Sequence, residues 1–287
     1  MYAALLDEQL IMARDALDEQ NSAQLIFLCP NCLEPVQLVN AGRAGPYFRH
    51  PNTTFRTEET QEHQLGKKVL ASGLTALGVE NMLEVPLVSD QIRADVYVTH
   101  AGHAYGLEIQ CAPLGTTEYS IRHDFYRSEN ITDIWLIGRR HFLRKKIKQI
   151  HLDLLRTNSR WGNYLLEIDV NAHHLRLKYN IQQDDLNLNC RYQTQIFALD
   201  EKGIMQLIKF RPVQLAIYRY DYVAARNYVV RQVRQKTNIG LALAQFCYER
   251  NLAPLELPLS LFVGYRDPGK SVLLLDKIVQ LPIKKVG

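Results

Sequence analysis

The spacing of apolar residues predicts a mixed arrangement of helices and strands in the middle of the chain. Residues 58–78 show helical spacing, with Leu70, Leu74 and other leucines on one face. Three extended segments follow at residues 82–88, 92–99 and 104–110, separated by short polar turns. A polar amphipathic helix then runs to about residue 130, and residues 131–137 have the composition of a buried strand. The predicted order is therefore helix, three strands, helix, strand.

The regions on either side of this central part have different patterns. Short strands are predicted at residues 2–6, 10–14 and 25–28, in a loop-rich module that buries little surface by itself. Downstream, an apolar stripe predicts a helix over residues 139–156, and residues 164–179 favour a hairpin. We expect three parts: an N-terminal β module at 1–56, a central domain at 57–157 and a mostly helical, basic C-terminal region at 158–287.

Composition and charge are those of an ordinary globular protein. The 287 residues are 47% hydrophobic and 22% charged, with a formal net charge of +4, which by itself implies only mild attraction to polyanions. Five scattered cysteines fit reduced thiols better than a disulfide framework. The acidic start of the chain is unlike a secretory signal, and no apolar run is long enough to span a membrane, so we expect a cytoplasmic protein without a membrane partner.

Acidic residues in two of the predicted strands indicate a cation site. Asp95 lies in one strand, and Glu108 and Gln110 share one face at the end of the next, with Ile109 on the other face. Two carboxylates converging at a strand edge suit a hard divalent cation such as Mg²⁺, which can activate water against a phosphodiester. Acids at strand ends also commonly cap turns or face solvent, and spacing alone leaves that alternative open.

Several short motifs, taken in order, resemble the competence protein CoiA-like family. They are Cys-Pro-x-Cys at 29–32, Phe-Arg-His at 48–50, Glu59-Thr-x-x-His63 with Lys67, Glu84, Arg-Ala-Asp-Val at 93–96, Glu-Ile-Gln at 108–110, Arg122-x-x-x-Tyr126 and Ile-Trp-Leu-Ile at 134–137. The middle domain of that family resembles nucleases of the PD-(D/E)xK superfamily. The resemblance implies an α+β or α/β, restriction-endonuclease-like (αβββαβ) core, between a small zinc-knuckle-like module and a mainly helical C-terminal region.

Carried over by this resemblance, Asp95 and Glu108 take the places of the two catalytic acids and would hold Mg²⁺ or Mn²⁺. Gln110 stands where the superfamily usually has lysine. A neutral amide cannot stabilise negative charge as an ammonium does, so the departure leaves enzymatic activity uncertain. Glu84 and Glu59 are further candidates as ligands or water-orienting groups, although Glu59 also suits the first turn of a helix electrostatically.

Other polar residues are candidates for contacts with DNA phosphates. His63 and Lys67 are four residues apart on one predicted helix, which makes them either phosphate ligands or an exposed polar stripe. Arg122 and Tyr126 are also one helical turn apart, and they suit a backbone phosphate or a structural pairing with a neighbouring acid. A basic cluster offers further phosphate contacts or a merely solvated helix face, and its candidates are Arg140, Arg144 and Lys145.

The N-terminal module contains a candidate structural zinc site. Cys29 and Cys32 have the spacing of a zinc knuckle, and His50 is a candidate third ligand. The spacing gives no clear fourth ligand, with His63 and His103 as weak candidates, and a lone pair of this spacing can also be two ordinary thiols. In the absence of zinc, packing against a neighbouring domain would have to stabilise the module.

Together these features predict a DNA-processing protein of natural competence that acts on incoming single-stranded or branched DNA for recombination, by metal-dependent phosphodiester hydrolysis. The alternative is a weak or inactive nuclease fold that binds DNA or a recombination protein as an accessory factor. A scaffold that only binds protein partners is a third hypothesis.

Overall fold

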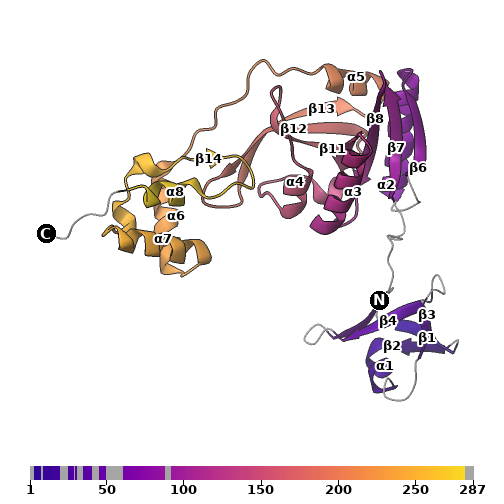
Figure 1. Ribbon diagram of the computed structural model, residues 1–287, viewed down its shortest axis with the longest axis horizontal. Coiled ribbons are helices and arrows are strands. Elements are labelled where there is room, and N and C mark those ends of the chain that lie inside the picture. The colour runs from indigo at the N-terminus through magenta and orange to yellow at the C-terminus, as the bar shows by residue number, and fades with distance from the viewer. Residues whose placement is uncertain are drawn as a thin grey trace. The chain divides into compact units, whose positions relative to one another are not determined.

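The computed structural model describes residues 3–7, 9–19, 25–28, 30, 35–40, 45–49, 61–87 and 92–281. Its contacts divide the chain into two compact units, Met1–Glu59 and Thr60–Gly287. Figure 1 shows both units, with the smaller one in indigo.

The smaller unit is a five-stranded sheet with one helix. Its strands pair in the order β2-β1-β3-β4-β5, and the aromatic rings of Phe27 and Phe48, with centroids 5.0 Å apart, lie in its core. The elements are β1 (Ala3–Leu6), β2 (Gln9–Met12), α1 (Ala13–Glu19), β3 (Phe27–Leu28), β4 (Pro35–Asn40) and β5 (Pro46–Arg49). The candidate zinc ligands Cys29, Cys32 and His50 lie outside the described residues.

The larger unit begins with the predicted order of helix, three strands, helix and strand. Its first elements are α2 (Gln61–Ala76), β6 (Glu80–Leu87), β7 (Ile92–His100), β8 (His103–Gln110), α3 (Thr116–Ser128) and β9 (Ile131–Ile137). Strands β6, β7 and β8 are antiparallel, whereas β8 and β9 are parallel. A crossover through α3 accounts for the parallel pair, because parallel neighbours need a long connection.

The same sheet continues into the region expected to be mostly helical. Strands β11 (Gly162–Asp169), β12 (His174–Asp184) and β13 (Cys190–Ala198) extend it, and the path across it is β13-β12-β11-β9-β8-β7-β6. Two short strands, β10 (Arg156–Asn158) and β14 (Tyr265–Arg266), pair with β11 and β12. The predicted hairpin is confirmed as β11–β12, but the helices of this region begin only at residue 201.

The helix predicted over residues 139–156 is wrong for most of its length. This segment is a 3₁₀ turn, η2 (Arg139–His141), an extended stretch and the short helix α4 (Gln149–Leu154). Leu143 and Ile147 are buried as the apolar stripe requires, but the backbone between them pairs with residues 188–190 instead of closing helical turns. Tertiary pairing therefore overrides the helical periodicity here.

Helices cover both faces of the sheet. The main core lies under α2 and α5 (Glu201–Lys209), where Leu70, Leu74 and Ile204 meet side chains of the sheet. The second core lies under α3 and α4, and includes Tyr119, Trp135 and Leu143. The candidate residues on β8 point to this second face, because Glu108 and Gln110 alternate with the main-core residues Leu107 and Ile109.

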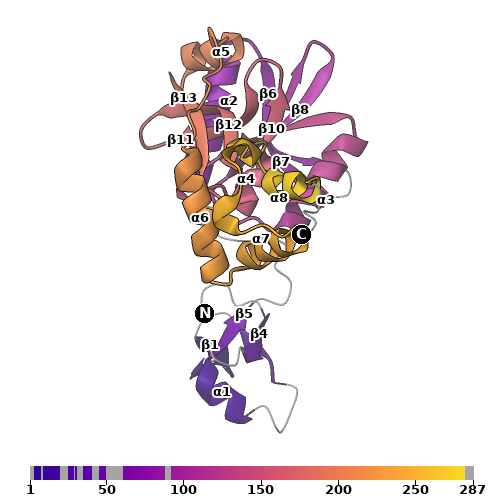
Figure 2. The ribbon, with the colours of Figure 1, turned by 90° about the vertical axis from the view of Figure 1, so that its left-hand side faces the viewer.

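The C-terminal helices form a separate core within the larger unit. They are α6 (Tyr222–Arg234), α7 (Asn238–Glu249), η3 (Pro254–Glu256), η4 (Leu259–Leu261) and α8 (Leu273–Val279). Figure 2 shows α6, α7 and α8 gathered together. The buried Asp185 connects this group to the end of β12, because its carboxylate accepts the backbone N–H groups of Leu273 and Leu274. None of the described helices has the length and apolarity needed to cross a membrane.

Candidate functional site

Asp95 and Glu108 come from neighbouring strands and lie across from each other. The paired register of β7 and β8 ends with Val96 opposite Leu107, and Asp95 and Glu108 are the next residues on the two strands. The Oδ2 atom of Asp95 accepts the backbone N–H of Ile109 at 2.8 Å, which ties the carboxylate to the end of β8. The two acids are close enough that the charge of Asp95 helps to raise the pKa of Glu108.

The backbone is irregular at this point. Residues two apart in a regular strand share one face. In β7, however, Ala94 packs in a small core with Tyr126 and Val96 packs in the main core, so the strand turns over at Asp95. On the next strand Glu84 adopts φ of 55°, a left-handed conformation that is uncommon for a residue with a side chain. A strained residue of this kind persists only where the surrounding structure holds it in place, and such residues are often found at functional sites.

Glu108 is fully buried with both carboxylate oxygens engaged. Tyr126 donates its hydroxyl to Oε1, and the Arg122 guanidinium pairs with Oε2. Arg122 is held by Trp135, whose ring centroid lies 5.1 Å from its Cζ atom. Burial raises the pKa of Glu108 to about 8, and this effect outweighs the opposing influence of Arg122. The group therefore exchanges its proton near neutral pH.

Asp95 is in the opposite electrostatic state. Burial alone would raise the pKa of this carboxyl, but the hydrogen bond and positive charge of His63 outweigh that effect and lower it. The His63 Nε2 atom lies 2.8 Å from Oδ2 of Asp95. The site thus pairs a carboxylate held ionised with a carboxyl that is easily protonated, a separation typical of acid–base sites.

Lys67 brings a buried amine to the same site. It lies one turn after His63 on α2, with only 5% of its surface exposed, and its ammonium donates to Glu84. Burial lowers its pKa, although the charges of Asp95 and Glu108 partly offset that effect. Arg93 also pairs with Glu84, at 2.5 Å. Lys67 therefore lies with Glu84, Asp95 and Glu108, and not in an exposed polar stripe.

Gln110 is buried beside Glu108 on the same strand, and its amide nitrogen donates to the carbonyl of Ala112 at 2.7 Å. This bond leaves the amide oxygen as the polar atom that can meet a water or a phosphate group. Gln110 carries no positive charge. Among the described residues, Lys67 is the only lysine that is buried.

The structure changes the role of some predicted phosphate contacts. Tyr126 is fully buried with its hydroxyl on Glu108, so it holds that carboxylate and does not meet a phosphate. Arg122 is mostly buried and also serves Glu108, while Arg140, Arg144 and Lys145 are exposed on the segment after β9. Glu59 lies outside the described residues.

One structural requirement of the site was missed from the sequence. Gly106 lies under the Tyr126 ring, and an added Cβ atom would come within 2.6 Å of the Tyr126 Cε1 atom. Its position two residues before Glu108, on the same strand face, is the only sequence signal that could have suggested this role.

A comparison with protein families shows which family the chain belongs to. The family model for the nuclease-like domain of competence protein CoiA matches residues 59–212, more than half of the chain. The chain belongs to the competence protein CoiA family. No curated protein and no solved structure matches this CoiA-family chain. The matched range runs from α2 past α5, and it therefore includes β11, β12 and β13 as well as the strands that carry the acids.

The carboxylates of this CoiA-family site are of the donor type that a divalent cation prefers. Within the described ranges, no group of three or more His, Cys, Asp or Glu side chains is arranged to hold a metal. Mg²⁺ needs fewer protein ligands, because it is usually bound by one or two carboxylates with waters and substrate phosphate completing its shell. Asp95 and Glu108 supply two such carboxylates on adjacent strands, which is the donor type and number that Mg²⁺ and Mn²⁺ use.

Proposed function

We propose that this CoiA-family chain is a cytoplasmic DNA-processing protein that hydrolyses phosphodiester bonds in DNA taken up during natural competence, before recombination. The observation that carries the proposal is the meeting of Asp95, Glu108 and the buried Lys67 at one irregular point of the sheet. The order α2-β6-β7-β8-α3-β9 supports a restriction-endonuclease-like core. Single-stranded or branched DNA is the proposed substrate.

Asp95 and Glu108 would hold the divalent cation, Mg²⁺ or Mn²⁺. When bound, such an ion polarises the phosphodiester and lowers the pKa of a bound water. Glu108 must be deprotonated to act as a ligand, and its raised pKa makes metal binding favour higher pH. Arg122 and Tyr126 orient Glu108 through hydrogen bonds, while His63 keeps Asp95 ionised.

Lys67 would supply the cation that Gln110 lacks. Its amine reaches the acids from helix α2 instead of from β8, and its lowered pKa suits exchange of a proton with an attacking water. Glu84, held in its left-handed conformation, fixes the position of that amine. Gln110 would orient water or phosphate through its amide oxygen.

The role of Lys67 can be tested with a matched pair of variants. Lys67→Met removes the buried amine, whereas Lys68→Met removes the exposed amine of the adjacent residue on the same helix. We expect cleavage to fall about 100-fold or more in the first variant, within the range typical of lost acid–base groups, and to stay near the wild-type rate in the second. Equal rates in both variants would exclude a catalytic role for Lys67.

The cutting activity itself is tested with labelled single-stranded, duplex and branched DNA, with Mg²⁺, Mn²⁺ or chelator. Metal-dependent cutting that disappears in both Asp95→Ala and Glu108→Ala is the expected result. Binding without cutting under every condition would favour the alternative, an accessory factor that grips DNA or a recombination protein. One observation favours that alternative: both oxygens of Glu108 are already engaged within the protein.

Structural zinc in the N-terminal module is a separate proposal, with Cys29, Cys32 and His50 as ligands. Metal analysis of the purified protein tests it. About one zinc per chain is expected, falling to none in a Cys29→Ala, Cys32→Ala double variant, and a wild-type protein without zinc would refute the proposal.

A further inference from the structure

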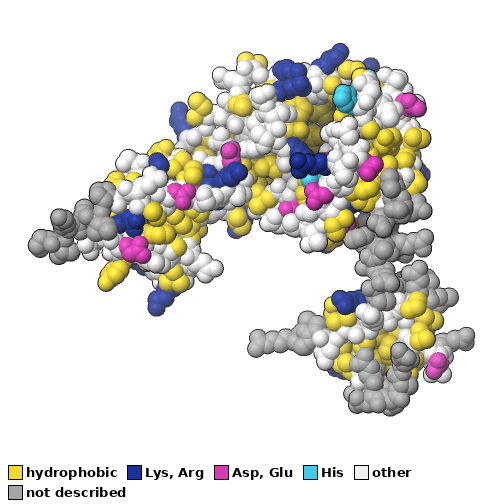
Figure 3. Space-filling model, viewed as in Figure 1, with side chains coloured by type: hydrophobic (Ala, Val, Ile, Leu, Met, Phe, Trp, Pro, Cys, Tyr) yellow, Lys and Arg dark blue, Asp and Glu magenta, His cyan; other side chains and the backbone are white. Residues whose placement is uncertain are grey.

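A second polar site lies in a basic pocket on the C-terminal half of the sheet. The pocket has a volume of about 650 Å³ and is lined by strands β11, β12 and β13 and by the extended segment after β9. Its six cationic side chains are Arg139, Arg144, Lys145, Arg176, Lys178 and Arg191. In Figure 3 this face of the larger unit is hollowed, with dark-blue Lys and Arg side chains beside the hollow.

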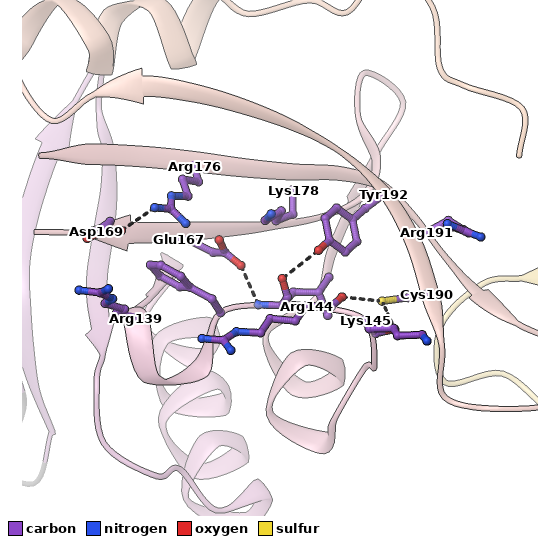
Figure 4. A pocket seen from close by; sticks show the side chains of 12 residues that line it. Arg139, Arg144, Lys145, Glu167, Asp169, Arg176, Lys178, Cys190, Arg191 and Tyr192 are labelled. Atoms are coloured by element: carbon purple, nitrogen blue, oxygen red, sulfur yellow. Dashed lines mark hydrogen bonds and ion pairs between the residues drawn. The ribbon is translucent and has the colours of Figure 1, made fainter. Parts of the chain in front are cut away.

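The pocket is built from side chains on opposing segments. Figure 4 shows Arg176 and Lys178 extending from β12 over Glu167, with Arg144 and Lys145 on the segment that faces them. Arg176 is fixed by its pair with Asp169 at 2.5 Å and by the Phe142 ring, 4.7 Å from its Cζ atom. Arg176 is therefore positioned before any ligand arrives.

Two buried polar atoms in the pocket lack partners. Among the described residues, the Nε atom of Arg176 and the Oε2 atom of Glu167 are buried without a hydrogen bond. Glu167 is fully buried, and its other oxygen accepts the backbone N–H of Leu143 at 2.7 Å. Unsatisfied buried groups are costly, so a ligand that supplied the missing partners, after a small shift of these side chains, would stabilise this part of the pocket.

The chemistry of these groups selects an oxyanion. Six cations line the pocket and outnumber its two carboxyl groups, Glu167 and Asp169. Burial raises the pKa of Glu167 to about 7, although Lys178 opposes this effect. A protonated Glu167 is then a further donor, since a neutral carboxyl has one O–H group. Donors on several sides suit the oxygens of a phosphate group.

The pocket also lies on the sheet face to which Glu108 and Gln110 point. Gln110, Ile137 and Glu167 are successive partners across the parallel strands β8, β9 and β11, so their side chains share one face. Neighbouring strands are about 4.8 Å apart, which places Glu167 roughly 10 Å from Gln110. A nucleic-acid strand that runs across this face can therefore place one of its phosphates at the acids and another in the pocket.

We infer that this pocket binds a phosphate group of a nucleic-acid strand, a few nucleotides from the phosphate that lies at Asp95 and Glu108. The position relative to the acids rests on the proposed function, whereas phosphate binding does not. A protein that binds DNA without cutting it would use the same pocket.

Two double variants of equal charge test the inference. Arg144→Ala with Lys145→Ala removes two exposed cations that line the pocket, and Lys146→Ala with Lys148→Ala removes two exposed cations of the same segment that do not. Binding of a labelled single-stranded oligonucleotide is measured by fluorescence anisotropy at several salt concentrations. Chelator and the Asp95→Asn background prevent cutting, so this result is independent of nuclease activity.

We expect the pocket double variant to bind about 10-fold more weakly, with a salt slope reduced by about 1.4 for two lost contacts to a single strand. The control double variant should stay within about 3-fold of the parent protein, since general attraction alone is screened by salt. Lys178→Ala should also weaken binding, because it removes a cation from the pocket floor. Equal losses in both double variants would overturn the inference, because the attraction would then be diffuse.

The oligonucleotide end distinguishes two sources of the phosphate. If the pocket takes a terminal phosphate, removing the 5′-phosphate will weaken binding to the parent protein. That loss should equal the loss that the pocket double variant causes with the phosphorylated oligonucleotide. If it takes an internal phosphate, the two oligonucleotides will bind alike and both will be weakened by the pocket variant. Each of these results supports a phosphate site.

Discussion

Glu108→Gln should change how stability depends on pH. The folded protein raises the pKa of this carboxyl from 4.5 to about 8, so the folded state binds the proton more tightly than the unfolded chain does. Its contribution to stability is full below about pH 4.5 and is lost as the pH rises to about 8. One group loses about 1.4 kcal/mol per pH unit within this window, or roughly 3 kcal/mol between pH 5 and pH 7.

The neutral amide of Glu108→Gln cannot contribute this slope. The wild-type free energy of unfolding should therefore fall relative to that of the variant by roughly 3 kcal/mol between pH 5 and pH 7. The variant also leaves Arg122 without its partner, but that cost does not depend on pH in this range because guanidinium stays charged. The quantity to measure is how the difference in unfolding free energy between the wild type and the variant changes with pH, and not the size of that difference at one pH.

Urea unfolding followed by tryptophan fluorescence provides this measurement. Both tryptophans of the chain, Trp135 and Trp161, lie in the larger unit, so the signal reports the unit that contains Glu108. Glu167, whose pKa is raised to about 7 by burial, titrates in both proteins, and its effect cancels in the difference. A difference that stays constant from pH 5 to pH 8 would refute the reasoning, because Arg122 and Tyr126 would then offset burial completely.

Three further predictions concern the groups around the acids and the C-terminal helices. Gly106→Ala places a Cβ atom 2.6 Å from the Tyr126 ring and should cost about 1–3 kcal/mol, measured as a lower urea midpoint; an unchanged midpoint would contradict this packing. Tyr126→Phe removes a hydrogen bond that favours ionised Glu108, so the pH profile of Mn²⁺ binding should move to higher pH, and a shift to lower pH would contradict that role. Asp185→Ala removes the carboxylate that accepts two backbone N–H groups of α8 and pairs with Arg266, and it should cost about 3 kcal/mol. We expect earlier proteolysis of the C-terminal helices; unchanged proteolysis would show that this carboxylate does not hold these helices in place.

The order of elements around the acids was predictable because each element shows the hydrophobic period of its own conformation. Strand β9 agrees with its prediction at both ends, and β7 and β8 agree within a residue or two, since their alternating or continuous apolar runs stop at polar turns. The helix expected over residues 139–156 failed for the opposite reason. Leu143 and Ile147 have helical spacing, but their burial comes from a backbone that pairs with a distant segment.

The candidate site was predictable in its residues more than in their contacts. Arg122 and Tyr126 do share one helix face, as their spacing requires, but that face meets Glu108. Sequence spacing gives the direction of a side chain relative to its own helix and says nothing of what the sheet presents to it. The left-handed Glu84 had no local signal, because the residue type usually avoids that conformation.

The basic pocket shows the same limit. Arg176 and Lys178 alternate with buried leucines on β12, which places the two cations on one face of a strand. The pocket arises only when the segment after β9 packs against that face, and this packing joins residues far apart in the chain.

Binding of Mn²⁺, measured by electron paramagnetic resonance, tests the proposed metal centre most directly. The wild-type protein should bind one ion at pH 8.5 and bind it more weakly at pH 6.5, because Glu108 must lose its proton first. Asp95→Asn should abolish this binding, whereas Glu80→Gln, which neutralises an exposed acid on β6, should retain it. Equal binding by the wild-type protein and Asp95→Asn would contradict a metal centre at Asp95 and Glu108.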